Sequence, residues 1–308
     1  MSIDSNLIKE LRLKTGAGIL DCKLALNKNE GKISDAIDWL RKKGLSVAAK
    51  KSARVAAEGL IGVSISENKA SMIEINSETD FVSRNKVFQD FVRNCCFLSV
   101  NANSDVEELS KMKYINSEST VQEELTKNIA TIGENLRIRR IENLKLMNDG
   151  LIVSYVHNAV AENLGKIGVL VCIESDEEKE ILEKIGKQIA MHIAATKPLA
   201  ININQLDTKV VENEKKILKE QTLSTGKPED IAEKIVQGKL NKFYQEVVLE
   251  EQIFVIDGKS QVKKVLQDFS KKSGKKIKIV DFKILILGEG IEVDEKDFAA
   301  EVAETAKH

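Results

Sequence analysis

Apolar residues recur three and four positions apart along the first 44 residues, which is the spacing of one face of a helix. Glycines at Gly16 and Gly18, at Gly31 and at Gly44 divide this region into three short helices. A bundle of this size closes only a thin core and is more typical of a binding module than of an enzyme. The apolar residues of the three predicted helices are Leu7, Ile8 and Leu11; Ile19, Leu20, Leu24 and Leu26; and Ile33, Ala36, Ile37 and Leu40.

From Gly59 the pattern becomes that of strands. Apolar runs at 60–65 and 70–75 flank a short polar turn, which predicts a β-hairpin. A helix follows, then a second helix over 118–132 that Gly133 stops, then a half-exposed strand over 136–141. The inward residues predicted for the first of these helices are Val87, Phe88, Phe91, Val92, Cys95 and Leu98.

This order then recurs. Strands are predicted at 151–156 and 167–173, followed by an acidic turn at 174–177 and a long helix that ends before Pro198. Hairpin, acidic turn and helix therefore occur twice, which predicts an internal duplication with two similar α+β halves.

Residues 207–224 and 229–249 predict two charged helices joined at Ser224–Pro228. Such a pair forms an antiparallel hairpin, and its few apolar residues indicate that it projects from the body. A helix at 260–272, a strand at 276–287 and a short amphipathic helix at 297–306 complete the chain.

The expected class is therefore α+β, and the expected domains combine these elements. They are a helical partner-binding module at 1–54, a first core subdomain at 55–145, a second at 146–197 with 239–275, a projecting helical hairpin at 198–238, and a C-terminal strand and helix at 276–308.

The composition of the chain argues against several classes of function. The 308 residues carry a net charge of −1, which argues against a bulk nucleic-acid binder. We expect no membrane span and no signal peptide, because the apolar runs are too short and the N-terminus lacks a basic region. Four cysteines without a C-x-x-C spacing indicate reduced thiols in the cytoplasm. The basic residues of 41–54 form either a solvated helical linker or a face that meets an acidic partner.

The sequence offers no catalytic constellation. His157 and His192 lie outside any nucleophile or metal-binding motif. The position of His192 on a helix face predicts a structural role for it. Gly16-x-Gly18 is not a phosphate loop, because no strand precedes it and no Gly-Lys-Ser/Thr follows. We therefore expect no cofactor and no metal, and a protein that acts on another protein.

One stretch stands out between the second strand and the helix that follows it, Asn76-Ser77-Glu78-Thr79-Asp80-Phe81-Val82-Ser83. In one interpretation Thr79 or Asp80 caps the helix and Phe81 staples it to the core. In the other interpretation, Phe81 is exposed and contacts a partner. The second acidic turn, at 174–177, has no aromatic residue, so a turn of this kind does not need one for its own fold. The exposure of the Phe81 side chain decides between them.

Several segments, in one order along the whole chain, resemble the translation elongation factor Ts family, the guanine-nucleotide exchange factors of elongation factor Tu. They are Leu11-Arg12-x-Lys14-Thr15-Gly16-Ala17-Gly18-Ile19-Leu20-Asp21-Cys22-Lys23, Glu78-Thr79-Asp80-Phe81-Val82, Ile132-Gly133-Glu134-Asn135, Ile189-Ala190-Met191-His192-Ile193-Ala194, Ser224-Thr225-Gly226-Lys227-Pro228 and Asp297-Phe298-Ala299-Ala300-Glu301-Val302.

The resemblance implies a ubiquitin-associated-like three-helix module, two similar core subdomains, an inserted hairpin and a C-terminal helix. It also implies roles for residues. Thr79, Asp80, Phe81 and Val82 would form the motif that dislodges magnesium from the partner, with the Phe81 ring as a wedge. Arg12, Ile19, Leu20, Ile132, Gly133 and His157 would be further partner contacts, although the family often has methionines at the positions of Ile19 and Leu20.

Two other functions remain as alternatives. A chaperone-like or structural protein would act through the helical hairpin, which would also allow copies to self-associate; deletion of 199–237 would separate this from nucleotide exchange. An unrecognised enzyme would need a turnover that depends on His157 or His192.

Overall fold

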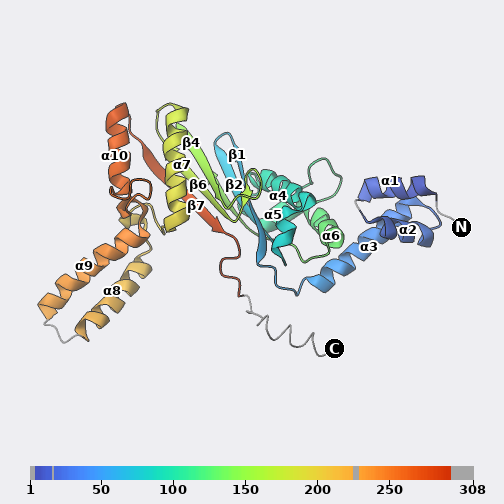
Figure 1. The fold of residues 1–308 in the computed structure, drawn as a ribbon, viewed down its shortest axis with the longest axis horizontal. Helices are drawn as coiled ribbons and strands as arrows, with labels where there is room; N and C mark the ends of the chain where they lie inside the picture. The colour runs from blue at the N-terminus through green and yellow to red at the C-terminus, as the bar shows by residue number, and fades with distance from the viewer. Residues whose placement is uncertain (1–3, 16, 225–228, 293–308) are drawn as a thin grey trace.

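The computed structural model describes residues 4–15, 17–224 and 229–292. Figure 1 shows an elongated molecule with a helical module at one end, two sheets with their covering helices in the middle, and a pair of helices at the other end. The predicted α+β class is confirmed, since the described residues form ten α-helices and two antiparallel sheets. Gly16, the predicted turn at 225–228 and the predicted helix at 297–306 lie outside the described residues.

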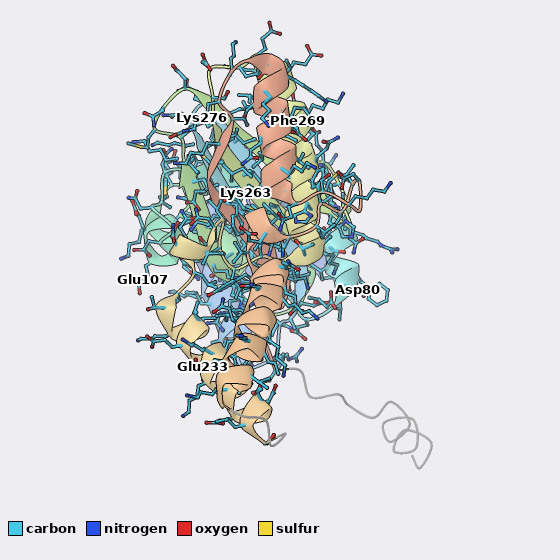
Figure 2. All side chains as sticks on the ribbon, turned by 90° about the vertical axis from the view of Figure 1, so that its left-hand side faces the viewer. Asp80, Glu107, Glu233, Lys263, Phe269 and Lys276 are labelled. Atoms are coloured by element: carbon cyan, nitrogen blue, oxygen red, sulfur yellow. The ribbon has the colours of Figure 1, made fainter. Side chains whose placement is uncertain are left out.

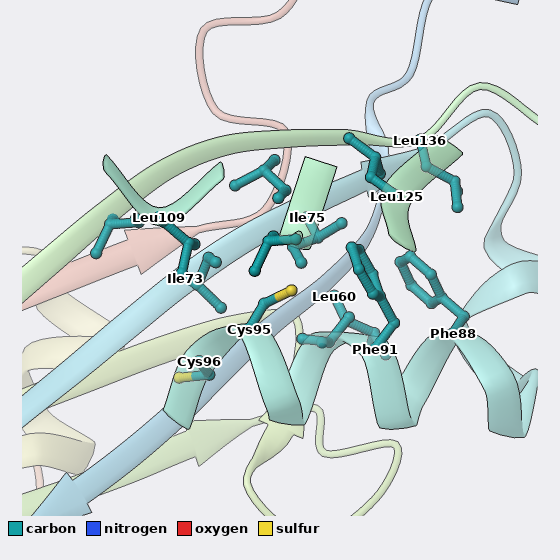
Figure 3. Packing of buried hydrophobic residues seen from close by; sticks show 14 of the residues in the cluster. Leu60, Ile73, Ile75, Phe88, Phe91, Cys95, Cys96, Leu109, Leu125 and Leu136 are labelled. Carbon is teal, nitrogen blue, oxygen red and sulfur yellow. The ribbon is translucent and has the colours of Figure 1, made fainter. Parts of the chain in front are cut away.

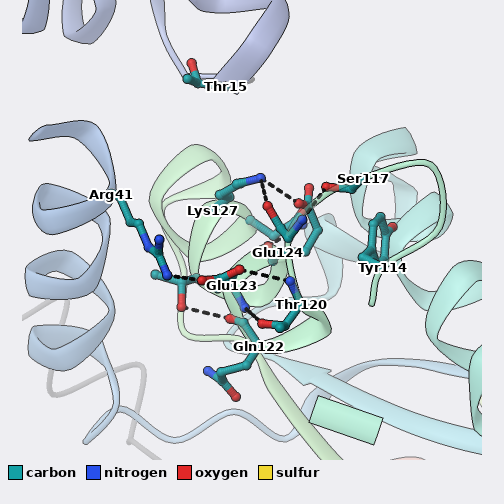
Figure 4. Close-up of polar contacts among 12 residues, drawn as sticks. Thr15, Arg41, Tyr114, Ser117, Thr120, Gln122, Glu123, Glu124 and Lys127 are labelled. Carbon is teal, nitrogen blue, oxygen red and sulfur yellow. Dashed lines mark hydrogen bonds and ion pairs between the residues drawn. The ribbon is translucent and has the colours of Figure 1, made fainter. Parts of the chain in front are cut away.

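The N-terminal module consists of α1 (Ser5–Thr15), α2 (Ile19–Lys28) and α3 (Ile33–Lys51) around a small core. The predicted end of the third helix at Gly44 is wrong, because α3 continues through Gly44 to Lys51. Gly44 is buried where α3 crosses α6: a Cβ at this position would lie 3.7 Å from Thr126 Cγ2 and 3.8 Å from Ala130 Cβ. The glycine thus permits close packing of two helices rather than ending one. Arg41 also pairs with Glu123 across this contact (Figure 4).

The first sheet has the strand order β3-β2-β1-β5, and helices cover one of its faces. Phe88 and Phe91 of α4 fill the space between helix and sheet, together with Leu60, Ile73 and Cys95 (Figure 3). The prediction that Val87 faces inward is wrong, since 51% of it is exposed. The elements of this part are β1 (Glu58–Ser66), β2 (Lys69–Ser77), β3 (Arg137–Lys145), β5 (Leu164–Gly165), α4 (Lys86–Ser99), α5 (Val106–Lys111) and α6 (Val121–Ile132).

The second sheet has the order β4-β6-β7, and α7 and α10 pack against its outer face. Its inner face lies against the first sheet through apolar residues of both, such as Ile61, Met72 and Leu170. The predicted hairpin, turn and helix are therefore present in each half, and the C-terminal strand joins the second sheet. The elements are β4 (Gly150–His157), β6 (Ile167–Glu174), β7 (Lys278–Ile286), α7 (Lys179–Thr196) and α10 (Val262–Ser273).

A buried carboxylate joins the two sheets. Glu74 of β2 is fully buried and accepts hydrogen bonds from Arg139, Arg140 and the backbone N–H of Gly288. Burial by itself raises the pKa of Glu74, but the Gly288 N–H and the Arg140 guanidinium outweigh burial and hold the pKa below its usual value. Glu74 therefore stays ionised and ties β2 and β3 to the turn after β7.

The helical hairpin consists of α8 (Thr208–Leu223) and α9 (Glu229–Val247), which pack through Leu218, Val236 and Leu240. Its base is held by backbone hydrogen bonds between 199–201 and 247–250. α9 runs without a break through the boundary predicted between 238 and 239. None of the described helices is long and apolar enough to cross a bilayer.

Candidate partner-binding site

Residues 78–83, the second part of the segment that the sequence singled out, form a separate loop between β2 and α4. β2 ends at Ser77, and after Glu78 and Thr79 the chain makes a 3₁₀ turn, η1 (Asp80–Arg84). α4 begins separately, with Asn85 as its cap: the Asn85 Oδ1 accepts a hydrogen bond from the Val87 N–H at 2.9 Å. We call residues 78–83 the Phe81 loop.

The Phe81 side chain is 78% exposed, so the interpretation of Phe81 as a core staple is wrong. Asp80 is also exposed, at the edge of the molecule in Figure 2. Val82, in contrast, is only 5% exposed and packs in the core of the first sheet. Within the four-residue motif Val82 therefore fixes the loop to the body, whereas Asp80 and Phe81 face outward.

Thr79 occupies the position before the 3₁₀ turn but does not cap it, contrary to the capping interpretation. Its hydroxyl instead donates to Glu134 Oε1 at 2.6 Å, and its backbone N–H donates to Glu134 Oε2 at 2.9 Å. Two segments that the sequence singled out separately, 78–82 and 132–135, thus lie side by side.

Ile132 and Gly133 form the end of α6. Gly133 has a φ of +86°, the left-handed conformation that ends a helix and favours glycine. The Lys51 ammonium donates to the Gly133 carbonyl, which links the end of α3 to this turn. Gly133 is exposed, whereas Ile132 is half-buried against the core of the first sheet.

Arg12, Ile19 and Leu20 all lie on the surface of the N-terminal module. α2 buries Cys22, Ala25 and Leu26 instead, which leaves Ile19 56% and Leu20 82% exposed. Leu13 on α1 is 86% exposed, and it lies off the helical stripe formed by Leu7, Ile8 and Leu11.

His157 is exposed at the end of β4, and its Nδ1 lies 2.9 Å from the Tyr155 hydroxyl. Its carbonyl accepts from the Lys166 N–H, and the Lys166 ammonium pairs with Glu58 at 2.6 Å. Because Glu58 lies opposite Ser77 in the first sheet, His157 and the Phe81 loop lie at the same end of the body.

His192, on α7, is buried, which agrees with the prediction of a structural histidine. Its Nε2 lies 2.9 Å from Gln252 Oε1, and its Nδ1 accepts from the Val255 N–H at 3.3 Å. Burial lowers the pKa of His192, so the ring stays neutral. The four cysteines are likewise buried, which confirms the inward position predicted for Cys95, and burial raises the pKa of Cys96 to about 12.

Comparison with known proteins gives consistent matches. The family model described as Elongation factor TS matches residues 78–289. Three curated relatives, each named Elongation factor Ts, are similar over nearly the whole length. The proteins of Rhodospirillum centenum and Allorhizobium ampelinum are each 48% identical to this chain, and the similarity covers 99% of this chain and 99% of each relative. The protein of Bartonella henselae is 48% identical, and the similarity covers 100% of both chains.

Proposed function

Because this chain belongs to the elongation factor Ts family, we propose that its Phe81 loop is the part that opens the nucleotide site of elongation factor Tu. The family acts in translation elongation as the nucleotide exchange factor of elongation factor Tu, in the cytoplasm and without covalent chemistry of its own. The observation that carries the proposal for this chain is the Phe81 ring, 78% exposed between residues that are fixed to the body.

The exposed ring suits a wedge. An aromatic side chain gains binding free energy when a partner covers its apolar surface. The nucleotide of a GTPase is held by magnesium and by backbone amides around its phosphates. If Phe81 and Asp80 fit the partner best when this site is distorted, the complex must weaken nucleotide binding by the same factor that nucleotide weakens the complex. GDP then leaves faster and GTP rebinds.

The other exposed candidates extend this surface. Arg12, Ile19 and Leu20 are exposed on the helical module, and His157 is exposed at the end of β4 in the second sheet. Gly133 lies next to the Phe81 loop through Glu134. We propose that these residues hold the partner while Phe81 acts on its nucleotide site.

The test is the release of labelled GDP from elongation factor Tu, with and without this chain. Faster release supports the proposal. A stable complex of the two proteins with an unchanged release rate would show that the mechanism is wrong.

The domain division remains part of the proposal. Support comes from the separate core of α1–α3 and from a helix-covered sheet in each half. The backbone hydrogen bonds between 199–201 and 247–250, at the base of the hairpin, also support it. Limited proteolysis tests it, with first cuts expected at 52–57 and near the bases of the hairpin helices.

Self-association through the hairpin is a second proposal. Some of its apolar side chains stay exposed outside the α8–α9 contact: Val210, Ile217, Leu223 and Ile231, at 37%, 39%, 43% and 51%. A deletion of 203–245 keeps the backbone hydrogen bonds at the base, which a cut at 199 would remove. Sedimentation of the full chain and of the deletion decides: a monomeric full chain contradicts self-association, and loss of exchange activity in the deletion would favour a hairpin-based function.

A further inference from the structure

Glu134 binds the Phe81 loop with both oxygens of its carboxylate. One accepts the Thr79 hydroxyl at 2.6 Å and the other accepts the Thr79 N–H at 2.9 Å. Hydrogen bonds to a charged acceptor are roughly twice as strong as those between neutral groups. Thr79 is therefore fixed in both its side chain and its backbone, two residues before Phe81.

Glu78 binds in the opposite direction. Its Oε1 accepts the Asn135 N–H at 2.6 Å, and its Oε2 lies 3.3 Å from the Arg54 guanidinium. The Asn135 side-chain amide donates to the Arg54 carbonyl at 2.7 Å. Residues 78–79 and 134–135 thus exchange carboxylate hydrogen bonds reciprocally, and we call Glu78, Thr79, Glu134 and Asn135 the clasp.

The clasp fixes one side of Phe81 and the core fixes the other. Val82 is buried, and the Ser83 hydroxyl donates to the Asp80 carbonyl at 2.6 Å. Only Asp80 and Phe81 lie between these anchors. A loop whose backbone is already held loses less conformational entropy when a partner binds it.

We propose that Glu134 and Glu78 are positioning residues for nucleotide exchange: the clasp holds the Phe81 loop so that the ring enters the partner already oriented. This inference rests on the proposed function of Phe81. It predicts that the clasp acts on exchange through Phe81 and has no separate effect on the partner.

The experiment is a double-mutant cycle in the GDP-release assay with elongation factor Tu. Glu134→Ala alone should lower the release rate at least about 10-fold, because loss of one charge-assisted hydrogen bond corresponds to about this factor and Glu134 accepts two from Thr79. In the Phe81→Ala background the same substitution should lower it less than about 2-fold, because the ring that the clasp positions is absent. Amide hydrogen exchange of Thr79 should speed up in Glu134→Ala.

Matched variants separate the clasp from general effects. Thr79→Val removes the hydroxyl and should slow release, whereas Thr79→Ser keeps both donors and should behave like the wild type. Glu118→Ala removes an equal charge near the start of α6 from a side chain that is 95% exposed, and should leave release unchanged. Thr79→Val also serves if Glu134→Ala does not fold.

Two results would overturn the inference: a wild-type release rate in both Glu134→Ala and Thr79→Val, or effects of Glu134→Ala and Phe81→Ala that multiply. In the second case Glu134 acts independently of the ring. A wild-type rate for Phe81→Ala alone would instead refute the proposed function, so the two failures are distinguishable.

Discussion

Replacing Phe81 with alanine separates the contribution of the ring to exchange from its contribution to folding. Burying a whole phenylalanine side chain contributes roughly 1.5–3 kcal/mol. Since Phe81 is 78% exposed, only about a fifth of it is covered in the free protein. The free energy of unfolding should therefore fall by about 0.5 kcal/mol, which is a Tm shift of about 1–2 °C for a chain of this size.

The effect on exchange should be much larger. If the partner covers the ring, the transition state for GDP release loses roughly 1.5–3 kcal/mol of apolar burial in Phe81→Ala. This corresponds to a release rate about 10- to 100-fold lower at the same protein concentration. The assay follows labelled GDP leaving elongation factor Tu, with this chain below saturation.

Phe88→Ala is the matched control. Phe88 is the same residue type in the first turn of α4 and is fully buried, so its loss should cost about 3–5 kcal/mol of folding free energy. If Phe81→Ala lowers Tm as much as Phe88→Ala, the ring is not exposed in solution. If Phe81→Ala releases GDP at the wild-type rate, the ring is not a wedge.

Three further predictions concern the body of the protein. Because burial lowers the pKa of His192, the unfolded chain binds more protons than the folded one in the range between this lowered pKa and the ordinary value of about 6.5. The free energy of unfolding, measured in urea, should therefore fall as the pH drops from 7 through the lowered pKa, and His192→Asn should reduce this dependence. Glu74→Gln should lower that free energy by about 3 kcal/mol, because it leaves two guanidinium groups without their shared carboxylate; an unchanged urea midpoint would contradict this. Gly44→Leu should push α3 away from α6 and weaken the complex with elongation factor Tu about 10-fold in a binding titration. Gly44→Ala should bind normally, because its Cβ would lie 3.7 Å from its nearest neighbour.

The sequence predicted most helices and strands because their patterns are local. The turn at Glu67–Asn68, the end of α6 at Gly133 and the strands of both hairpins follow from apolar periods and from residues that favour turns. The short helix α5 was missed, since six residues carry too little of a period. The prediction that Gly44 ends a helix was wrong, because a single sequence does not distinguish a glycine that ends a helix from one that allows a second helix to pack closely.

The motif at 78–82 shows what a sequence determines by itself and what it does not. Its residue types and its place between a strand and a helix marked it as unusual, and the resemblance carried by several segments indicated the family. Whether Phe81 is buried depends on how the loop leaves the sheet. That direction is set by Val82 in the core and by Glu134, 55 residues away from Thr79 in the chain. A contact between residues so far apart has no local period, so the exposed ring and the clasp that holds it appear only in the tertiary structure.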